Sequence, residues 1–415
     1  MKASILFCFI FLASILNAQS LTSSAYLSYS GKSGLIIENK IFTSGANGAT
    51  ISLSNCTGFI IRNCVFKNTP GSVSIQLSNC SDIQIQGCSF DSIKSGVYAI
   101  NCTGKLVIQC NAFKDIIGPK PRGQMVQFNT CTGAGNRVNN NILEQTSGVG
   151  IPEDLINMYA SYGTSSDPIQ ISGNKTRGGG PSTSGGGIML GDNGSHDIVA
   201  DNNILVNPGQ YGIAVPSGQN ITISNNSIFA SSQPFTNVGL YVGLATEINA
   251  GYACVGSSIK VSGNKVNWKN KTNLQNDIYF CSCCPGIVSV GNTTKSSISS
   301  SILPTVLQLN NTCASLNLNC SVLGSACPSV ITEIENVENA EIESFNIKIN
   351  NQILIATSKE KANWKLLDVN GKIYYEQENQ EVITVDLSTF QDGLYVLVTI
   401  TSTGKKIHKF IYSNN

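Results

Sequence analysis

The chain has 415 residues, of which 12% are charged, with 26 Lys and Arg against 25 Asp and Glu. This length predicts two or three domains, or one long repeat array with an appendage. The first 330 residues carry 18 basic and 13 acidic residues, whereas residues 331–415 carry 8 and 12, which predicts a boundary near residue 330. So small a basic surplus gives no reason to expect nucleic-acid binding.

The first twenty residues, MKASILFCFIFLASILNAQS, predict export. A lysine, an apolar run and small residues before Ala18 have the layout of a secretory signal peptide, so we expect residues 1–18 to be removed. The apolar run is too short for a transmembrane helix, and no later segment reaches about 18 apolar residues. Fourteen of the 15 cysteines follow this segment, an even number that suits an oxidising destination.

One phrase then recurs between residues 33 and 290. GFIIRNCVF (58–66) returns as DIQIQGCSF (82–90), HDIVADNNIL (196–205), NITISNNSI (220–228) and SIKVSGNKV (258–266). Each unit holds a strand of period two, a polar corner and a second strand, without helical periodicity. Repeats of this size indicate stacked supersecondary units.

One column of the repeat contains only Asn or Cys. Its members are Asn39, Cys64, Cys88, Asn111, Asn141, Asn174, Asn203, Asn226 and Asn264. Stacked coils lie about 4.8 Å apart, so each Asn can bond its amide to the rungs above and below. In the same column Cys64 and Cys88 are expected to be buried free thiols, with disulfides between adjacent rungs as the alternative. The late cysteines lack a period and are better disulfide candidates.

This repeat resembles that of the right-handed parallel β-helix proteins with pectate-lyase-like repeats. The resemblance covers residues 33–290 and implies an all-β fold, a right-handed parallel β-helix solenoid. The group includes lyases, hydrolases, epimerases and noncatalytic surface proteins, so the fold alone does not define an activity.

The C-terminal part has a different texture. Residues 291–335 are rich in Ser, Thr and Asn and contain three cysteines, which predicts a linker or cap tied by disulfides. Alternating strands and an Asn-Gly turn at 370–371 predict a small antiparallel β-sandwich over residues 340–415. The run VDLSTFQDGLYVLVTI (385–400) and the basic strand after it resemble the C-terminal sorting domain of the type IX secretion system of Bacteroidetes. That resemblance implies that residues 340–415 contact the secretion machinery, and that the protein is extracellular or on the outer-membrane surface.

Three consecutive long rungs point to the functional face. Their insertions are GPKPRGQ (118–124), GVGIPED (148–154) and RGGGPSTSGGG (177–187). Insertions in a solenoid collect on one face, often the binding face. If Val126, Ile156 and Ile188 and the residues two positions after them point inward, alternation turns Gln127, Asn157 and Tyr159 outward.

The main hypothesis is a lyase that cleaves an acidic, uronate-containing polysaccharide by β-elimination. Such an enzyme needs a group that neutralises the carboxylate, a base and an acid. The candidate catalytic residues are Tyr159, Arg122, Lys175 and His196. The candidate substrate-binding residues are Lys120, Gln127, Asp154, Asn157, Arg177 and Asp192. Because tyrosine ordinarily has a pKa of about 10, Tyr159 would need a cation such as Arg122 beside it to act as the base.

Two other functions compete with the lyase. An inverting glycoside hydrolase would need a pair of carboxylates, and Asp192 or Asp201 would have to belong to it. A noncatalytic adhesion protein would bind glycan along the same groove. We expect a monomer without a cofactor, although the turn GDNGSHD at 191–197 could bind Ca²⁺. The Cys281-x-x-Cys284 spacing is assigned to disulfides rather than to a metal.

Overall fold

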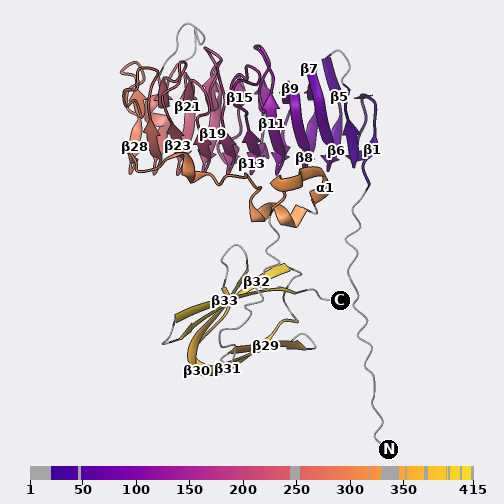
Figure 1. Cartoon of the computed structure of the whole chain (residues 1–415), viewed down its shortest axis with the longest axis vertical. Helices are drawn as coiled ribbons and strands as arrows, with labels where there is room; N and C mark the ends of the chain where they lie inside the picture. Colours follow the sequence, from indigo (N-terminus) through magenta and orange to yellow (C-terminus); the bar gives the residue numbers. More distant parts are fainter. Residues whose placement is uncertain are drawn as a thin grey trace, which may run out of the picture. The chain divides into compact units, whose positions relative to one another are not determined.

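A computed structural model of the chain describes residues 20–44, 48–243, 253–316, 318–328, 345–350, 353–368, 373–388, 390, 393–401 and 404–412. It divides into two compact units, residues 1–330 and 331–415, each considered by itself (Figure 1). The expected signal peptide and the expected Asn-Gly turn at 370–371 lie outside the described residues. None of the helices in the described part is long and apolar enough to cross a lipid bilayer.

The first unit is a parallel β-helix built from an 18-stranded and a 10-stranded sheet (Figure 1). The 10-stranded sheet contains β3 (Ile36–Glu38), β6 (Thr57–Arg62), β8 (Ser81–Gln86), β10 (Leu106–Gln109), β13 (Arg137–Asn139), β16 (Ile169–Ser172), β19 (His196–Asp201), β22 (Gln219–Ser224), β25 (Ile259–Ser262) and β28 (Val288–Val290). Its strands pair in parallel, one per coil, as the repeat predicts.

The 18-stranded sheet consists of two rows of parallel strands, which the long strands β7 (Val65–Ser78) and β9 (Ser89–Ile100) join. Row 1 also contains β1 (Thr22–Ser23), β4 (Lys40–Phe42), β11 (Ala112–Ile116), β14 (Ile142–Glu144), β17 (Lys175–Arg177), β20 (Ile204–Val206), β23 (Ser227–Ala230) and β26 (Lys265–Trp268). Row 2 also contains β2 (Leu27–Ser30), β5 (Gly48–Ser54), β12 (Val126–Asn129), β15 (Ile156–Tyr159), β18 (Ile188–Asp192), β21 (Tyr211–Val215), β24 (Val238–Val242) and β27 (Ile278–Phe280).

Asparagines form a buried ladder at the corner before row 1. The ladder contains Asn111, Asn141, Asn174, Asn203, Asn226, Asn264 and Asn292. Each amide nitrogen donates to the side-chain oxygen of the next member, as Asn203 does to Asn226 at 2.9 Å. Asn292 extends the predicted ladder by one coil.

The prediction that Asn39 belongs to this ladder is wrong. Because Ile41 pairs with Val65 in the β4–β7 register, Asn39 lies opposite Asn63, one residue before the ladder position of Cys64. Asn39 and Asn63 have φ values of 54° and 52°. Asparagine tolerates this left-handed conformation, so Asn is favoured at two neighbouring corner positions. The sequence alignment therefore shifted by one residue at Asn39.

Buried free thiols occupy two corner columns, and those of Cys64 and Cys88 were predicted. They are Cys56, Cys64, Cys80, Cys88, Cys102 and Cys131. One column continues as serines, since Ser161 Oγ accepts the Cys131 amide at 2.9 Å and Ser195 Oγ accepts the Ser161 amide at 2.8 Å. Among the later cysteines, Cys254 pairs with Cys284 and Cys281 with Cys283.

Each coil also contributes apolar side chains to a continuous core. Four phenylalanines, Phe42, Phe66, Phe90 and Phe113, stack with ring centroids 5.0, 4.8 and 4.4 Å apart. Burying an aromatic or aliphatic side chain of this size stabilises the fold by roughly 1.5–3 kcal/mol. The stack therefore both stabilises the coils and fixes their register.

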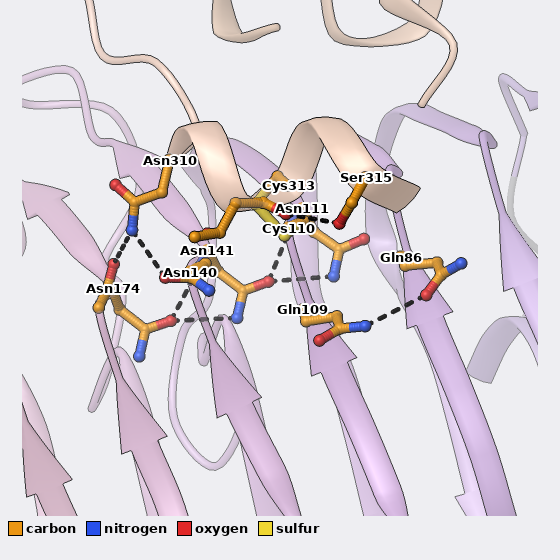
Figure 2. The surroundings of a disulfide bond; sticks show 12 residues. Gln86, Gln109, Cys110, Asn111, Asn140, Asn141, Asn174, Asn310, Cys313 and Ser315 are labelled. Carbon is orange, nitrogen blue, oxygen red and sulfur yellow. Dashed lines mark hydrogen bonds between the residues drawn. A yellow bond between two sulfur atoms is a disulfide. The ribbon is translucent and has the colours of Figure 1, made fainter. Parts of the chain in front are cut away.

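Residues 298–328, which we call the strap, run back along row 1 (Figure 1). The strap contains η2 (Ser300–Ile302), η3 (Asn311–Leu316), α1 (Cys320–Leu323) and η4 (Gly324–Ala326). Figure 2 shows the disulfide between Cys110 and Cys313 that joins it to the β-helix. Leu303, Leu307 and Leu309 are buried on the outer face of row 1. Thus much of the segment expected to be a linker or cap covers one side of the solenoid.

The second unit contains five antiparallel strands around its own core. They are β29 (Phe345–Asn350), β30 (Ile353–Asp368), β31 (Ile373–Asp386), β32 (Gly393–Thr401) and β33 (Gly404–Tyr412). Trp364, Leu366 and Leu397 are fully buried in this core. The structure therefore confirms an all-β chain, with a parallel solenoid followed by a small antiparallel domain.

Candidate functional site

One line of outward-facing side chains crosses row 2 in register, and we call it the outward line. It runs through Ser28, Ser52, Gln76, Tyr98, Gln127, Asn157, Met189, Ala214, Tyr241 and Tyr279. The predicted alternation is confirmed, because the flanking residues Val126, Phe128 and Met158 lie in the core. The insertions of the long rungs cover part of this line, and Gln127 and Asn157 are themselves buried.

Two carboxyl groups meet at the centre of the line. The Asn157 side-chain amide donates to Asp154 Oδ2 at 2.7 Å and to Asp192 Oδ2 at 3.1 Å. Since both contacts share one nitrogen, the two Oδ2 atoms are at most about 5.8 Å apart. The other oxygen of Asp154 accepts the Gly186 amide at 3.2 Å and the Tyr211 hydroxyl. Asp154 is buried and Asp192 is partly exposed, so Asp192 is the more exposed member of the pair.

Burial tunes both carboxyl groups toward the protonated form. Burial raises the pKa of Asp154 to about 7, although the hydrogen bonds from Tyr211 and Asn157 act in the opposite direction. Burial also raises the pKa of Asp192, while the Asn157 hydrogen bond, the Asn193 amide and the charge of Lys120 oppose that rise. A carboxyl group that keeps its proton near neutral pH can serve as a general acid.

The insertions bring two cations and a third acid to the same place. The Arg122 guanidinium lies 3.7 Å from the centroid of the Tyr98 ring and donates to Gln127 Oε1 at 3.5 Å. Gln127 in turn donates to Asn157 Oδ1 at 3.4 Å. A second set of contacts links the three insertions to one another. Ser184 donates to Glu153 at 2.5 Å, and Lys120 Nζ lies 3.5 Å from Ser184 Oγ.

The structure places the four predicted catalytic residues on different parts of the β-helix. Arg122 stacks on Tyr98, not beside Tyr159 as the lyase hypothesis required. Tyr159 faces outward, and its register partners are Asn129 and Asp192. It is therefore next to Asp192 of the carboxyl pair.

Lys175 and Arg177 lie in row 1 under the strap. Lys175 donates to the Gln308 carbonyl at 3.2 Å, and burial lowers the pKa of this lysine. Arg177 binds Glu144 and the Pro304 and Thr305 carbonyls. Because the strap occupies these side chains, they are not available to a substrate on row 2.

His196 begins β19 in the 10-stranded sheet. Its ring stacks on Tyr162 with centroids 4.3 Å apart, and its Nδ1 lies 2.6 Å from Asp197 Oδ2. The two acids of the 191–197 turn therefore have different partners, Asn157 for Asp192 and His196 for Asp197. Within the described residues, no cluster of three or more His, Cys, Asp or Glu side chains could hold a metal ion.

Tyr98 and Tyr211 are site residues that the sequence did not reveal. Tyr211 opens the apolar strand YGIAV and lies 57 residues from Asp154, so its sequence context resembles core. Tyr98 lies in GVYAI, two rungs before Asn157, where no insertion drew attention to it. The stacking of the rungs brings these tyrosines close to the carboxyl pair, and nothing in their local sequence indicates it.

Two family models match the chain. Residues 15–152 match the right-handed beta helix region, and residues 341–413 match the secretion system C-terminal sorting domain. The chain thus combines a parallel β-helix with a type IX sorting domain. It is a secreted or cell-surface protein.

The solved structures to which the chain is similar include a lyase and two tailspikes. The alginate lyase from Paenibacillus sp. str. FPU-7 is 13% identical with a TM-score of 0.37, over 66% of this chain and 91% of the lyase. The tailspike of E. coli bacteriophage HK620 in complex with a hexasaccharide is 9% identical with a TM-score of 0.29, over 95% and 70%. Tailspike protein 2 of bacteriophage CBA120 is 10% identical with a TM-score of 0.29, over 94% and 63%. No curated protein matches the chain. Identities and TM-scores as low as those of the solved structures give no information about the substrate.

Proposed function

We propose that the protein binds a polysaccharide across row 2 and hydrolyses a glycosidic bond with Asp154 and Asp192. The observation that carries this proposal is the Asn157 amide held between the two carboxyl groups. Most glycoside hydrolases use a pair of carboxyl groups. The partly exposed ring of Tyr159, the register partner of Asp192, suits the apolar face of a sugar.

The separation of the pair favours retention over the inversion that the hydrolase alternative assumed. Inverting enzymes keep the carboxyl groups roughly 6.5–9.5 Å apart to admit a water molecule, whereas retaining enzymes keep them about 5–5.5 Å apart. The upper limit of about 5.8 Å between the Oδ2 atoms fits the closer arrangement.

The proposed chemistry divides the roles by pKa. Asp154 gives its proton to the leaving oxygen while the Asp192 carboxylate attacks the anomeric carbon, so the glycosidic bond breaks as a glycosyl ester forms. Asp154, now ionised, removes a proton from water, and that water releases the sugar and regenerates Asp192.

β-Elimination on a uronate polymer is the second candidate. It is favoured by Tyr159, which faces outward next to Asp192 in the register. It is disfavoured by local charge, because with Asp154 protonated the charges of Glu153 and Asp192 balance those of Lys120 and Arg122, which leaves no surplus positive charge to bind a uronate. We therefore expect a neutral polysaccharide to be the better substrate.

Incubation with xylan, β-glucan, polygalacturonate and alginate tests these functions. Hydrolysis releases reducing ends only, whereas elimination also produces an unsaturated sugar that absorbs ultraviolet light. Asp192→Asn should slow hydrolysis by about 10²- to 10⁴-fold and leave the fold intact. Asp201→Asn in β19 is the matched control and should keep full activity. Binding without cleavage would contradict both enzymatic functions and support the adhesion protein.

A further inference from the structure

Two tyrosines end the outward line. Tyr241 in β24 and Tyr279 in β27 are register partners, with ring centroids 5.8 Å apart and ring planes 7° from parallel. Tyr279 is 50% exposed. In the described part of the chain, β27 is the last strand of row 2, so no further strand of this row covers the outer face of that ring.

The positions of the line between these rings and the carboxyl pair are apolar and buried. Met189 and Ala214 occupy the two intervening positions of the line, and they pack with Tyr211 and Val238 in one cluster against which Tyr241 rests. The outward line therefore has a polar half around Asn157 and an apolar, aromatic half that ends at Tyr279.

This division matches the two kinds of surface that a sugar offers. Hydroxyl groups at the ring edge pair with amides and carboxylates, whereas the C–H face of a pyranose stacks on a flat aromatic ring. Tyr279 presents such a ring, held by its parallel neighbour, on the same line of side chains as Asn157.

The spacing extends the site well beyond one sugar. Tyr241 lies three rungs from Asn157 and Tyr279 lies four, about 14 and 19 Å at the usual strand spacing. We propose that Tyr241 and Tyr279 form a remote subsite that stacks on a sugar ring of the polysaccharide, whose chain lies along the β-helix axis. This inference rests on the proposed function, and it names the direction of the substrate and its second anchor.

Affinity electrophoresis of the full chain in gels that contain xylan, β-glucan, polygalacturonate or alginate tests the subsite. Tyr241→Ala and Tyr279→Ala should each weaken retardation by about two- to tenfold, the range expected for a lost stacking contact. Tyr279→Phe keeps the ring and should bind like the wild type. Tyr26→Ala is the matched control, because Tyr26 is 59% exposed and precedes β2 at the other end of the solenoid.

Cleavage assays on short oligosaccharides, prepared from the polymer that retards the protein, separate the contribution of the subsite from the reaction itself. Tyr279→Ala should cleave short fragments at the wild-type rate and long chains more slowly, because only long chains reach the tyrosines. If both alanine variants are retarded as strongly as the wild type, the subsite is wrong and the proposed function stands. If no polysaccharide retards the wild type, both proposals are wrong.

Discussion

Asn203 shows how a single corner residue supports three coils. Its amide nitrogen donates to the Ile171 carbonyl at 2.8 Å and to Asn226, and its oxygen accepts from the Asn174 amide and side chain. Asn203→Ala leaves these buried partners unsatisfied, so we expect a loss of about 1–3 kcal/mol in the free energy of unfolding. Urea denaturation measures the change. Asn237→Ala, at an exposed position, should leave the midpoint in place, and an unchanged midpoint for Asn203→Ala would contradict the buried ladder.

Asp154 should make stability depend on pH. Burial raises its pKa from 3.8 to about 7, so the folded chain holds this proton more tightly than the unfolded chain does. Between about pH 4 and 7 the folded state therefore binds more protons, and this carboxyl group lowers the free energy of unfolding as pH rises, by at most ~1.4 kcal/mol per pH unit. Asp154→Asn removes this contribution. The difference in unfolding free energy, variant minus wild type, should increase with pH across that window, and a constant difference would show that Asp154 has an ordinary pKa.

At the scale of elements, the Cys110–Cys313 disulfide joins the strap to the β-helix. The Cys110–Cys313 disulfide spans 203 positions of the sequence, whereas Cys320–Cys327 spans 7. In the chain-entropy description, the longer loop contributes ~3 kcal/mol more to stability than the shorter one. We expect Cys110→Ala with Cys313→Ala to lower the denaturation midpoint much more than Cys320→Ala with Cys327→Ala. Limited proteolysis should then cleave the strap first, and equal midpoints for the two double variants would contradict this role.

The polar contacts of the strap explain why its course could not be predicted. Asn310 donates to Asn140 Oδ1 at 2.6 Å, and the Asn319 amide donates to Asn63 Oδ1 at 3.0 Å (Figure 2 shows Asn310 and Asn140). These partners lie 170 and 256 residues away in the sequence and follow no repeat. The β-helix was predictable because each coil repeats the same alternation and the same corner residues.

The part of the candidate site that lies on the repeated strands was predictable from the sequence. Gln127 and Asn157 follow from alternation, since each lies between two inward positions of its strand. The pairing of Asp154 with Asp192 depends on how the insertion 148–154 folds against β18, and the contact of Arg122 with Tyr98 depends on how the insertion 118–124 folds over β9. Inserted segments have no periodicity, so sequence alone could name their polar residues but not their contacts.

At the scale of the whole molecule, two units with separate cores suit two separate tasks. The β-helix core and the core of residues 354–397 contain different residues, and the division between units falls after residue 330. A unit with its own hydrophobic core can fold independently. The sorting domain can therefore direct transport while the solenoid carries the proposed binding face.

Deletion of residues 340–415 should leave the β-helix folded and stop its transport to the cell surface, because this segment contains the sorting domain. In a host with a type IX secretion system, cell fractionation should find the truncated protein in the periplasm and the full chain outside. Circular dichroism of the purified truncated protein should show the same β-rich fold and a cooperative melt, which excludes misfolding as the cause. As the converse control, residues 340–415 fused to a periplasmic reporter should carry the reporter out of the cell. Truncated protein outside the cell at the level of the full chain would show that this unit does not direct transport.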